Sequence, residues 1–282
     1  MEPTAPAADL AAAAAHAVGV EDQPKHLTGR KGADTWRAGT WTIKTAVPGA
    51  RGHLAHEHAA YELLHRQGRH LGPRGAAGPQ GRWMAVPWVD GHPLWDTFAP
   101  AREGTATAEQ RTQMRDAVRA ALTALQEFHT AGWIHGDMQT ENAVVLPGGG
   151  VEFIDFDNAH HSADLPLTVP YRGGLVHVIA PEIAAQLMAT GDDQHVRLTP
   201  EAELYALGAA LYWAWTGVRI TDYRGDPAGP HVELFADIAD GRRRNLTEDR
   251  PWTDPELEAL ILGATRPAPA SRSYNSAPEP RQ

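Results

Sequence analysis

The sequence predicts an α+β protein with two lobes, a small strand-rich first lobe and a larger α-helical second lobe. Strand-like alternation dominates the chain before about residue 89, and helical periodicity dominates most of it afterwards. The length of 282 residues is too great for one small core and fits one two-lobed domain or two compact domains. We expect lobes over residues 19–88 and 89–272, with flexible tails over 1–18 and 273–282.

The first lobe is predicted from an alternating run and one helical stripe. Polar Thr42 and Lys44 alternate with apolar Trp41 and Ile43, which is typical of a strand, and Gly39-Thr40 marks a turn before them. A run rich in Gly and Pro predicts a loop between the helix and the last strand. The expected elements are two strands within 27–47, a helix over 53–66, a loop over 69–82 and a strand over 83–89.

The second lobe is predicted to be mainly helical. Val118, Leu122 and Leu125 recur at the spacing that places them on one side of a long helix. Pro147 and the three glycines after it separate two apolar runs, which indicates a hairpin. The expected elements are a short helix over 94–98, a loop over 99–107, a helix over 108–130, strands over 143–146 and 151–154, and helices over 181–189, 201–216, 231–240 and 255–264.

Composition excludes several classes of function. The net charge of −10 argues against a nucleic-acid-binding protein and would favour a cationic substrate. The absence of cysteine excludes disulfides, thiolate catalysis and Cys-ligated zinc, and makes a reducing cytoplasm the expected compartment. We expect no signal peptide, because the Ala-rich start lacks a basic leader, and no membrane partner, because the longest apolar run covers only residues 204–218.

Three polar residues supply the set of groups that phosphoryl transfer from ATP uses. Asp137 is followed five residues later by Asn142, and thirteen residues after that by Asp155. This chemistry needs one carboxylate for the acceptor hydroxyl and two oxygen ligands for Mg²⁺ on the triphosphate. Lysine occurs only at positions 25, 31 and 44, and Lys44 ends an alternating strand, where its charge could hold phosphate oxygens. ATP and Mg²⁺ are therefore the expected cofactors.

These residues belong to a set of motifs that resembles the protein-kinase-like superfamily, over roughly residues 20–272. The second lobe resembles bacterial Ser/Thr kinases, whereas the His-Gly-Asp sequence is similar to the catalytic loop of aminoglycoside and choline phosphotransferases. The resemblance implies a two-lobed protein-kinase-like fold. The matching residues are Thr42-Ile43-Lys44, Glu57, His135-Gly136-Asp137 with Asn142, Asp155-Phe156-Asp157, Ala180-Pro181-Glu182, the helix that carries Glu203, and Arg272.

The resemblance implies catalytic roles for five of these residues. Lys44 would contact the α- and β-phosphates, and Glu57 would orient its amine. Asp137 would align the substrate hydroxyl and accept its proton. Asn142 and Asp155 would hold Mg²⁺, for which hard oxygen ligands are suited.

The resemblance also implies a nucleotide-binding surface. Adenine would pair with the backbone C=O of Pro87 and the N–H of Val89, and Val144 would pack beneath the purine. Proline is tolerated at the first of these positions because it lacks only the N–H. Gly29 and Gly32 would cover the phosphates, although they do not form a full glycine-rich repeat.

Two ion pairs follow from the same comparison. Glu57 competes with Glu62 as the partner of Lys44, and Glu57 is favoured because it lies near the start of its helix. Glu182 and Arg272 would form a largely buried ion pair with a structural role.

The chain departs from the protein-kinase pattern at three positions. Gly136 stands where most protein kinases have an arginine that binds a phosphate on the activation segment, so we expect activity that does not need phosphorylation there. Gln139 replaces a lysine close to the γ-phosphate, which weakens the case for a protein substrate. Glu203 replaces an aspartate that braces the catalytic loop.

Three functions remain open from the sequence. The first is a kinase that acts on Ser or Thr of a peptide or protein, with a ribosomally made peptide under modification as one setting. The second is a small-molecule phosphotransferase that acts on the hydroxyl of an aminoglycoside-type antibiotic. The third is a pseudokinase that binds a partner without catalysis. The sequence indicates neither the acceptor nor the oligomeric state.

Overall fold

The computed structural model describes residues 3–30, 33–50, 54–70, 72–167 and 170–275. The chain divides into two compact units. Strands dominate the first and helices the second, so the α+β prediction is confirmed. Within the described ranges, no helix has both the length and the apolar character that a bilayer crossing requires. The first unit contains Met1–Val89, Asp155–His160 and Asp164–Thr168, and the second contains Asp90–Ile154, His161–Ala163 and Val169–Gln282.

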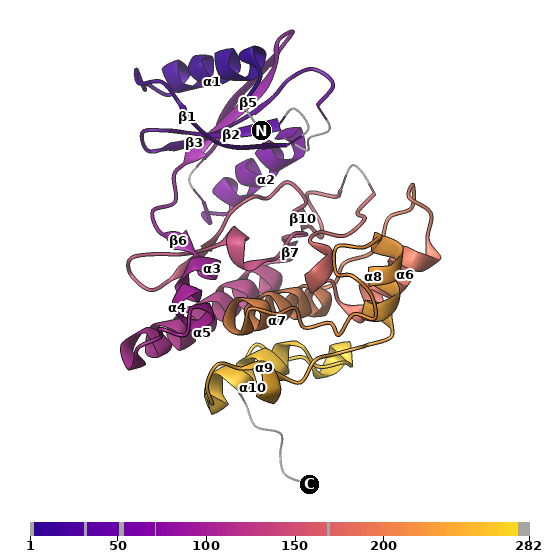
Figure 1. Ribbon diagram of the computed structural model, residues 1–282. Helices are drawn as coiled ribbons and strands as arrows, with labels where there is room; N and C mark the ends of the chain where they lie inside the picture. Colours follow the sequence, from indigo (N-terminus) through magenta and orange to yellow (C-terminus); the bar gives the residue numbers. More distant parts are fainter. Residues whose placement is uncertain (1–2, 31–32, 51–53, 71, 168–169, 276–282) are drawn as a thin grey trace. The chain divides into compact units, whose positions relative to one another are not determined.

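The first unit is built on a five-stranded antiparallel sheet with the strand order β1-β2-β3-β5-β4 (Figure 1). The register places Lys44 of β3 between Thr35 of β2 and Met84 of β5. Gly39, with φ +55°, lies in the turn between β2 and β3, where the sequence predicts a turn. The strands are β1 Lys25–Arg30, β2 Ala33–Ala38, β3 Trp41–Ala46, β4 Arg74–Gly78 and β5 Gly81–Pro87.

Two of these strands correct the sequence prediction. Residues 27–47 were expected to form two strands, but β1, β2 and β3 make three. Residues 69–82 were expected to form a loop, but Arg74–Gly78 pairs with β5 as an edge strand. Every residue of β4 is exposed, and its composition is Gly and Ala beside one Arg. Backbone pairing with β5 defines this strand, and its sequence has no alternation of large apolar and polar side chains from which a strand could be predicted.

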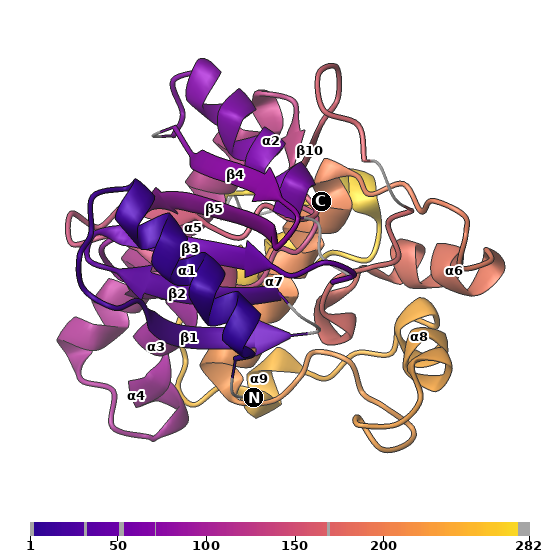
Figure 2. The same cartoon turned by 90° about the horizontal axis from the view of Figure 1, so that it is seen from above.

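Two helices cover the two faces of the sheet. Helix α1, Ala5–Ala17, packs on the face that presents Trp36 and Ile43, and Figure 2 shows it running across the strands. Successive side chains of a strand point to opposite faces, so Lys44 points away from α1. On that opposite face lies helix α2, Leu54–Arg66, which contacts β3 and β5.

Helix α1 also corrects the predicted flexible tail over residues 1–18. Ala7, Ala11, Ala14 and Ala15 are buried against the sheet and form one stripe of the helix. Their small side chains let the helix backbone approach the sheet closely. An Ala-rich stripe differs little in sequence from exposed alanine, which is why the prediction missed it.

The second unit is mainly helical, as predicted. It begins its helices with α3 Leu94–Thr97, and α4 Ala99–Arg102 replaces part of the loop expected over 99–107. The longer helices agree with the predicted ranges to within a residue, whereas α9 was not predicted. The remaining helices are α5 Ala108–Thr130, α6 Pro181–Ala189, α7 Pro200–Thr216, α8 His231–Ala239, α9 Leu246–Asp249 and α10 Pro255–Ala264.

Short elements complete the described chain. The strands β6, β8 and β9 form an antiparallel sheet in which β8 is central. They include the predicted hairpin. The short strands are β6 His92–Pro93, β7 Trp133–Ile134, β8 Ala143–Val145, β9 Val151–Phe153 and β10 His160–His161, and the 3₁₀ turns are η1 Thr140–Asn142, η2 Val176–Val178 and η3 Pro269–Ser271.

Helix α7 is the centre of the second unit. Most of its residues are buried, and it contacts α4, α5 and α10. Gly208 allows the close approach to α10, because a Cβ atom there would lie 2.6 Å from Thr265 Cγ2 and 2.8 Å from Ala264 Cβ. This packing fixes the helix that carries Glu203.

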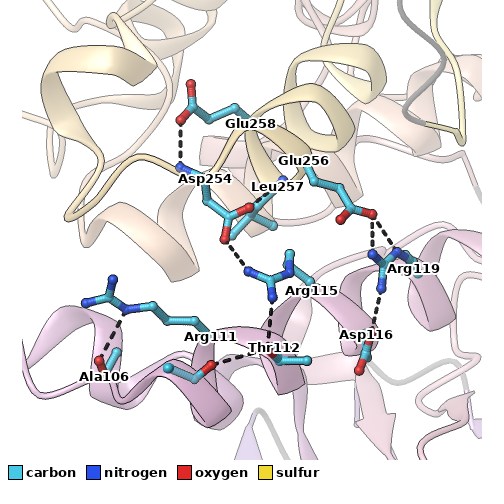
Figure 3. Close-up of polar contacts among 11 residues, drawn as sticks. Ala106, Arg111, Thr112, Arg115, Asp116, Arg119, Asp254, Glu256, Leu257 and Glu258 are labelled. Carbon is cyan, nitrogen blue, oxygen red and sulfur yellow. Dashed lines mark hydrogen bonds and ion pairs between the residues drawn. The ribbon is translucent and has the colours of Figure 1, made fainter.

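Ion pairs join α5 to α10 in the same unit (Figure 3). Arg115 Nη1 lies 2.8 Å from Asp254 Oδ2, and Arg119 Nε lies 2.7 Å from Glu256 Oε1. Asp254 also caps α10, since its Oδ1 accepts a hydrogen bond from the N–H of Leu257. The cap and the ion pair together tie the start of α10 to α5.

The predicted tail over residues 273–282 needs a partial correction. The hydroxyl of Tyr274 lies 2.6 Å from Nδ1 of His129 at the end of α5, so this residue is held by the second unit. Residues 276–282 lie outside the described part of the chain.

Candidate active site

The first unit brings Lys44, Glu57 and Asp155 together. Lys44 points from β3 toward α2, and its Nζ lies 2.6 Å from Oε1 of Glu57 in the first turn of that helix. The same amine donates a hydrogen bond to Oδ1 of Asp155. Glu57 is 2% exposed, whereas Glu62 is 55% exposed and lies 3.9 Å from His58. The structure thus pairs Lys44 with Glu57 rather than with Glu62.

The charges of this cluster keep Lys44 protonated. Burial lowers the pKa of Lys44, but the carboxylates of Glu57 and Asp155 outweigh burial and hold the pKa above its usual range. Burial raises the pKa of Glu57, against the opposing effect of Lys44, and Asp155 raises it further. Two carboxylates share one ammonium, so the cluster carries surplus negative charge. That surplus suits a bound cation beside Asp155, which is 42% exposed.

Asp155 has an unusual backbone conformation, and the residues that follow it contact helix α2. Its φ of +68° is the only left-handed value among the non-glycine residues that the structure describes. Such a conformation persists where surrounding contacts hold it. Within the same unit, the ring of Phe156 packs edge-on against Tyr61 at 5.0 Å, and Nε2 of His56 lies 2.5 Å from the carbonyl of Ala159. Helix α2 therefore anchors the segment that carries Asp155.

The second unit brings Asp137 and Asn142 together. Nδ2 of Asn142 donates to the backbone oxygen of Asp137 at 2.8 Å and to its Oδ2 at 3.3 Å. Nε2 of Gln139 also donates to Oδ2, at 3.0 Å. The carbonyl of Asn142 accepts a hydrogen bond from Ile154, the residue before Asp155. Asp137 is therefore oriented by polar contacts from its own loop.

The donor atoms fit Mg²⁺. Asn142 uses its amide nitrogen for Asp137, so its amide oxygen takes part in neither bond. That oxygen and the carboxylate of Asp155 are hard ligands of the kind Mg²⁺ prefers. Among the residues that the structure describes, no group of three or more His, Asp or Glu is arranged to hold a metal. Mg²⁺ commonly needs only one or two protein ligands when phosphates supply the others.

Glu203 of α7 braces the catalytic loop. Its carboxylate accepts hydrogen bonds from the backbone N–H of His135 at 2.9 Å and of Gly136 at 2.7 Å, and from Nε2 of His129 at 2.8 Å. Burial would raise the pKa of Glu203, but His129 and His135 outweigh burial and hold the pKa below its usual range. The buried side chain is therefore an anion with three donors, which suits a structural brace.

Two residues of this network were not found by sequence reasoning. His129 connects Glu203 to the hydroxyl of Tyr274, so the chain near its described end reaches Glu203, the brace of the catalytic loop, through two hydrogen bonds. The partners are 74 and 145 residues apart along the chain. A local sequence pattern cannot predict a contact between residues so far apart along the chain. Nε2 of His135 lies 2.9 Å from the carbonyl oxygen of Ile154, so the catalytic loop also contacts the residue just before Asp155.

The register of the sheet determines the direction in which the predicted adenine-binding groups, the Pro87 carbonyl and the Val89 N–H, point. The N–H of Trp88 donates to Thr40 at 2.7 Å, so Trp88 turns its backbone groups toward β3. In an antiparallel ladder, the backbone N–H and C=O groups of the residues before and after such a residue point away from that neighbouring strand. The carbonyl of Pro87 and, in an extended chain, the N–H of Val89 therefore point away from β3. Pairing of β4 with β5 ends at Ala85, so β4 does not extend to them.

The structure places two of the remaining residues that were predicted to contact the nucleotide. Val144 is buried in β8. Gly29 lies in β1 opposite Asp34, and a Cβ atom there would clash with the carboxylate of Asp34, which is bonded to His26 at 2.9 Å. Packing against Asp34 on the neighbouring strand thus explains why position 29 is a glycine, without any contact with phosphate. Gly32 lies outside the described residues.

Glu182 and Arg272 form a bidentate ion pair. The two distances are 2.6 Å and 2.8 Å, and the side chain of Arg272 is fully buried. Its guanidinium also donates to the backbone oxygens of Glu201, Arg266 and Pro267. The pair ties the start of α6 to the segment that follows α10.

Comparisons with known proteins find kinases among the sequences that are similar to this chain. No family model matches the chain. A probable serine/threonine-protein kinase of Streptomyces coelicolor is 25% identical over 199 residues, which are 71% of this chain and 27% of that protein. The serine/threonine-protein kinase PknA of Mycobacterium tuberculosis is 34% identical over 146 residues, which are 52% and 30%. The human serine/threonine-protein kinase PAK 4 is 24% identical over 183 residues, which are 64% and 28%.

These matches cover less than a third of each relative's own length. The antiparallel sheet followed by a mainly helical part is consistent with the two-lobed kinase fold. The chain is therefore a distant homologue of the serine/threonine protein kinases and belongs to the protein-kinase-like superfamily.

Proposed function

We propose that the protein is an ATP- and Mg²⁺-dependent phosphotransferase that moves the γ-phosphoryl group to a hydroxyl. The position of Lys44 between Glu57 and Asp155 is the observation that carries the proposal. It holds a permanent positive charge, suited to phosphate, beside a carboxylate suited to Mg²⁺. The distant homology to kinases supports phosphotransfer. A pseudokinase would need neither the lysine pair nor the polar contacts of Asp137.

In the proposed reaction the acceptor oxygen attacks the γ-phosphorus and forms a new P–O bond. The bond from that phosphorus to the bridging oxygen breaks, and ADP leaves with the bond's electrons. Asp137 aligns the hydroxyl and takes its proton, while Lys44 binds the α- and β-phosphates. Asn142 and Asp155 would hold Mg²⁺, which would neutralise negative charge on the triphosphate.

We propose Ser or Thr of a peptide or protein as the acceptor, and a ribosomally made peptide fits this class. Support comes from the segment beside Asp137, whose Leu175 N–H reaches the carboxylate and whose far end is anchored by Glu182 and Arg272. Such an anchored segment offers an extended peptide a surface to lie on. The relatives named above are described as serine/threonine kinases.

A small-molecule phosphotransferase is the second candidate. The net charge of −10 favours it, because an acidic protein attracts a polycationic aminoglycoside. Gly136 also fits this candidate, because the His-Gly-Asp sequence is similar to the catalytic loop of aminoglycoside and choline phosphotransferases.

One experiment separates these candidates. ATP labelled at the γ-phosphate is incubated with Mg²⁺, the protein and either Ser/Thr peptides or aminoglycosides, and we expect label in the peptides. Asp137→Asn should abolish transfer and leave Mg·ATP binding unchanged, whereas Asp116→Asn, at an exposed position of α5, should behave as the wild type. Label in the antibiotics alone would favour the second candidate. Transfer by Asp137→Asn at the wild-type rate would contradict the role of Asp137.

We also propose a cytoplasmic location, because ATP is supplied there and the absence of cysteine fits a reducing compartment. Fractionation of cells that produce the protein would test this.

A further inference from the structure

The segment around Gly174 lies directly on the catalytic loop. The backbone N–H of Leu175 donates to Oδ1 of Asp137 at 3.3 Å. Gly174 approaches the same oxygen so closely that a Cβ atom at this position would clash with it. The position of this segment and the position of the Asp137 carboxylate are therefore coupled.

Tyr171 begins this segment and is buried, with 6% exposure. It shares with Gly136, Asp137 and Glu203 the wall of a cavity whose volume open to the centre of a water molecule is about 20 Å³. That volume is enough for about one water molecule. Burial raises the pKa of the Tyr171 hydroxyl, and the charges of Glu203 and Asp137 raise it further, so the phenol stays neutral. A neutral aromatic ring thus lines the cavity beside the catalytic loop.

The backbone of Tyr171 is held as firmly as its ring. Its N–H donates to Nδ1 of His195 at 3.1 Å, and its carbonyl accepts from the N–H of Val196 at 3.2 Å. Val196 is 1% exposed and belongs to the buried core. Both backbone polar groups of Tyr171 are therefore used, and they connect the segment to the chain just before α7.

The loop offers no cation at the position next to this tyrosine. Gly136 has φ +84° and directs its N–H to Glu203, and it has no side chain that could bind a phosphate. Arg172 follows Tyr171, but its guanidinium is bound to the carbonyls of Leu187 and Thr190. A phosphate on the segment would therefore find neither of these positions available as a receptor.

We propose that Tyr171 is a permanent anchor that holds residues 171–175 on the catalytic loop, so that the loop is assembled without phosphorylation of this segment. The inference rests on the proposed function, and Tyr171 acts as a positioning residue through Asp137. In a phosphate-driven switch, a new charge pair orders such a segment. Here a buried aromatic ring and three hydrogen bonds, two made by the backbone of Tyr171 and one by Leu175, have that role.

Hydrogen exchange of the phosphatase-treated protein, with intact mass used to verify the absence of phosphate, tests the anchor without any substrate. We expect the amide of Leu175 to be protected in the wild type. Tyr171→Phe should leave that protection within about threefold, because the ring is kept. Tyr171→Ala should speed exchange at Leu175 by tenfold or more. Leu260→Ala, a cavity variant at a buried site of α10, is the control and should leave residues 171–175 protected.

Two results would overturn the proposal. One is rapid exchange at Leu175 in the unphosphorylated wild type, with protection that appears only after phosphorylation. The other is unchanged exchange in Tyr171→Ala. Both are independent of whether an acceptor has been identified, so they separate failure of the anchor from failure of the proposed reaction. Once an acceptor is known, Tyr171→Ala should lower kcat by tenfold or more with the KM for ATP unchanged, and Tyr171→Phe should restore kcat.

Discussion

Lys44 donates a hydrogen bond to Glu57 across 2.6 Å, and this contact links β3 to α2 inside the first unit. The two side chains are 18% and 2% exposed, so little water competes with the pair. A hydrogen bond between charged groups contributes about 1.5–3 kcal/mol. The contact therefore fixes the direction of the amine that the proposed reaction uses to hold phosphates.

Glu57→Gln should weaken binding of Mg·ATP by about tenfold or more, because each 1.4 kcal/mol of lost interaction corresponds to a factor of about ten. Titration calorimetry measures this affinity directly. Glu62→Gln changes an exposed carboxylate on the same helix and should bind as the wild type does. Equal losses in the two variants would count against an orienting role for Glu57.

Glu203→Gln should destabilise the second unit by about 3–5 kcal/mol at neutral pH, as expected when one member of a buried charged network is removed. Glutamine offers one acceptor oxygen where the carboxylate now has three donors, from His129, His135 and Gly136. Urea unfolding followed by tryptophan fluorescence provides the measurement. Glu201→Gln, at an exposed position of the same helix, should cost little.

The same residue predicts a pH dependence. The pKa of Glu203 in the folded protein lies below its usual value, because His129 and His135 outweigh the burial that would raise it. A depressed carboxylate pKa stabilises the fold above the ordinary glutamate pKa of about 4.3, and the stabilisation is lost as the pH falls through the folded pKa. The stability difference between the wild type and Glu203→Gln should therefore shrink below about pH 4. A difference that stays constant down to acid would contradict the charged brace.

Arg272→Ala should destabilise the protein by about 3–5 kcal/mol, because it removes a fully buried guanidinium and leaves Glu182 and several carbonyls without their donor. Arg119→Ala is the matched control. Arg119 also pairs with an acid, but it is 45% exposed, and such surface pairs contribute about 0–1 kcal/mol (Figure 3). Chemical unfolding of both variants tests the contrast, and similar costs for the two would contradict a structural role for the Glu182 pair.

Sequence patterns predicted the fold where local signals agree. Pro at the start and regular apolar spacing marked α6 and α10, whose predicted ranges match the observed ones. Strand β3 was recognisable by alternation. The signal failed for β4, which has only Gly and Ala beside one Arg, and for α1, whose buried stripe is almost entirely alanine. In both cases the stabilising contact is made by backbone or by a methyl group.

The candidate site was predictable to the extent that its residues lie in short motifs. Glu57 was chosen as the partner of Lys44 from its place at the start of a helix, and the contact is present. The links to Glu203 through His129, and to the catalytic loop through Tyr171, were not predicted. They join positions tens of residues apart, and only tertiary packing brings these side chains together.

Helix α1 supports the strand that carries Lys44, and charge placed in its buried stripe should expose that dependence. Ala11 is fully buried against the sheet, so Ala11→Glu would bury a carboxylate without a partner and should destabilise the first unit by several kcal/mol, on the order of 3. Ala13→Glu adds the same side chain on the exposed side of the same helix and should have little effect. Thermal unfolding compares the two, and Mg·ATP affinity should fall in Ala11→Glu only at temperatures where that unit has begun to unfold. A flexible segment over residues 1–18 would instead tolerate both substitutions equally.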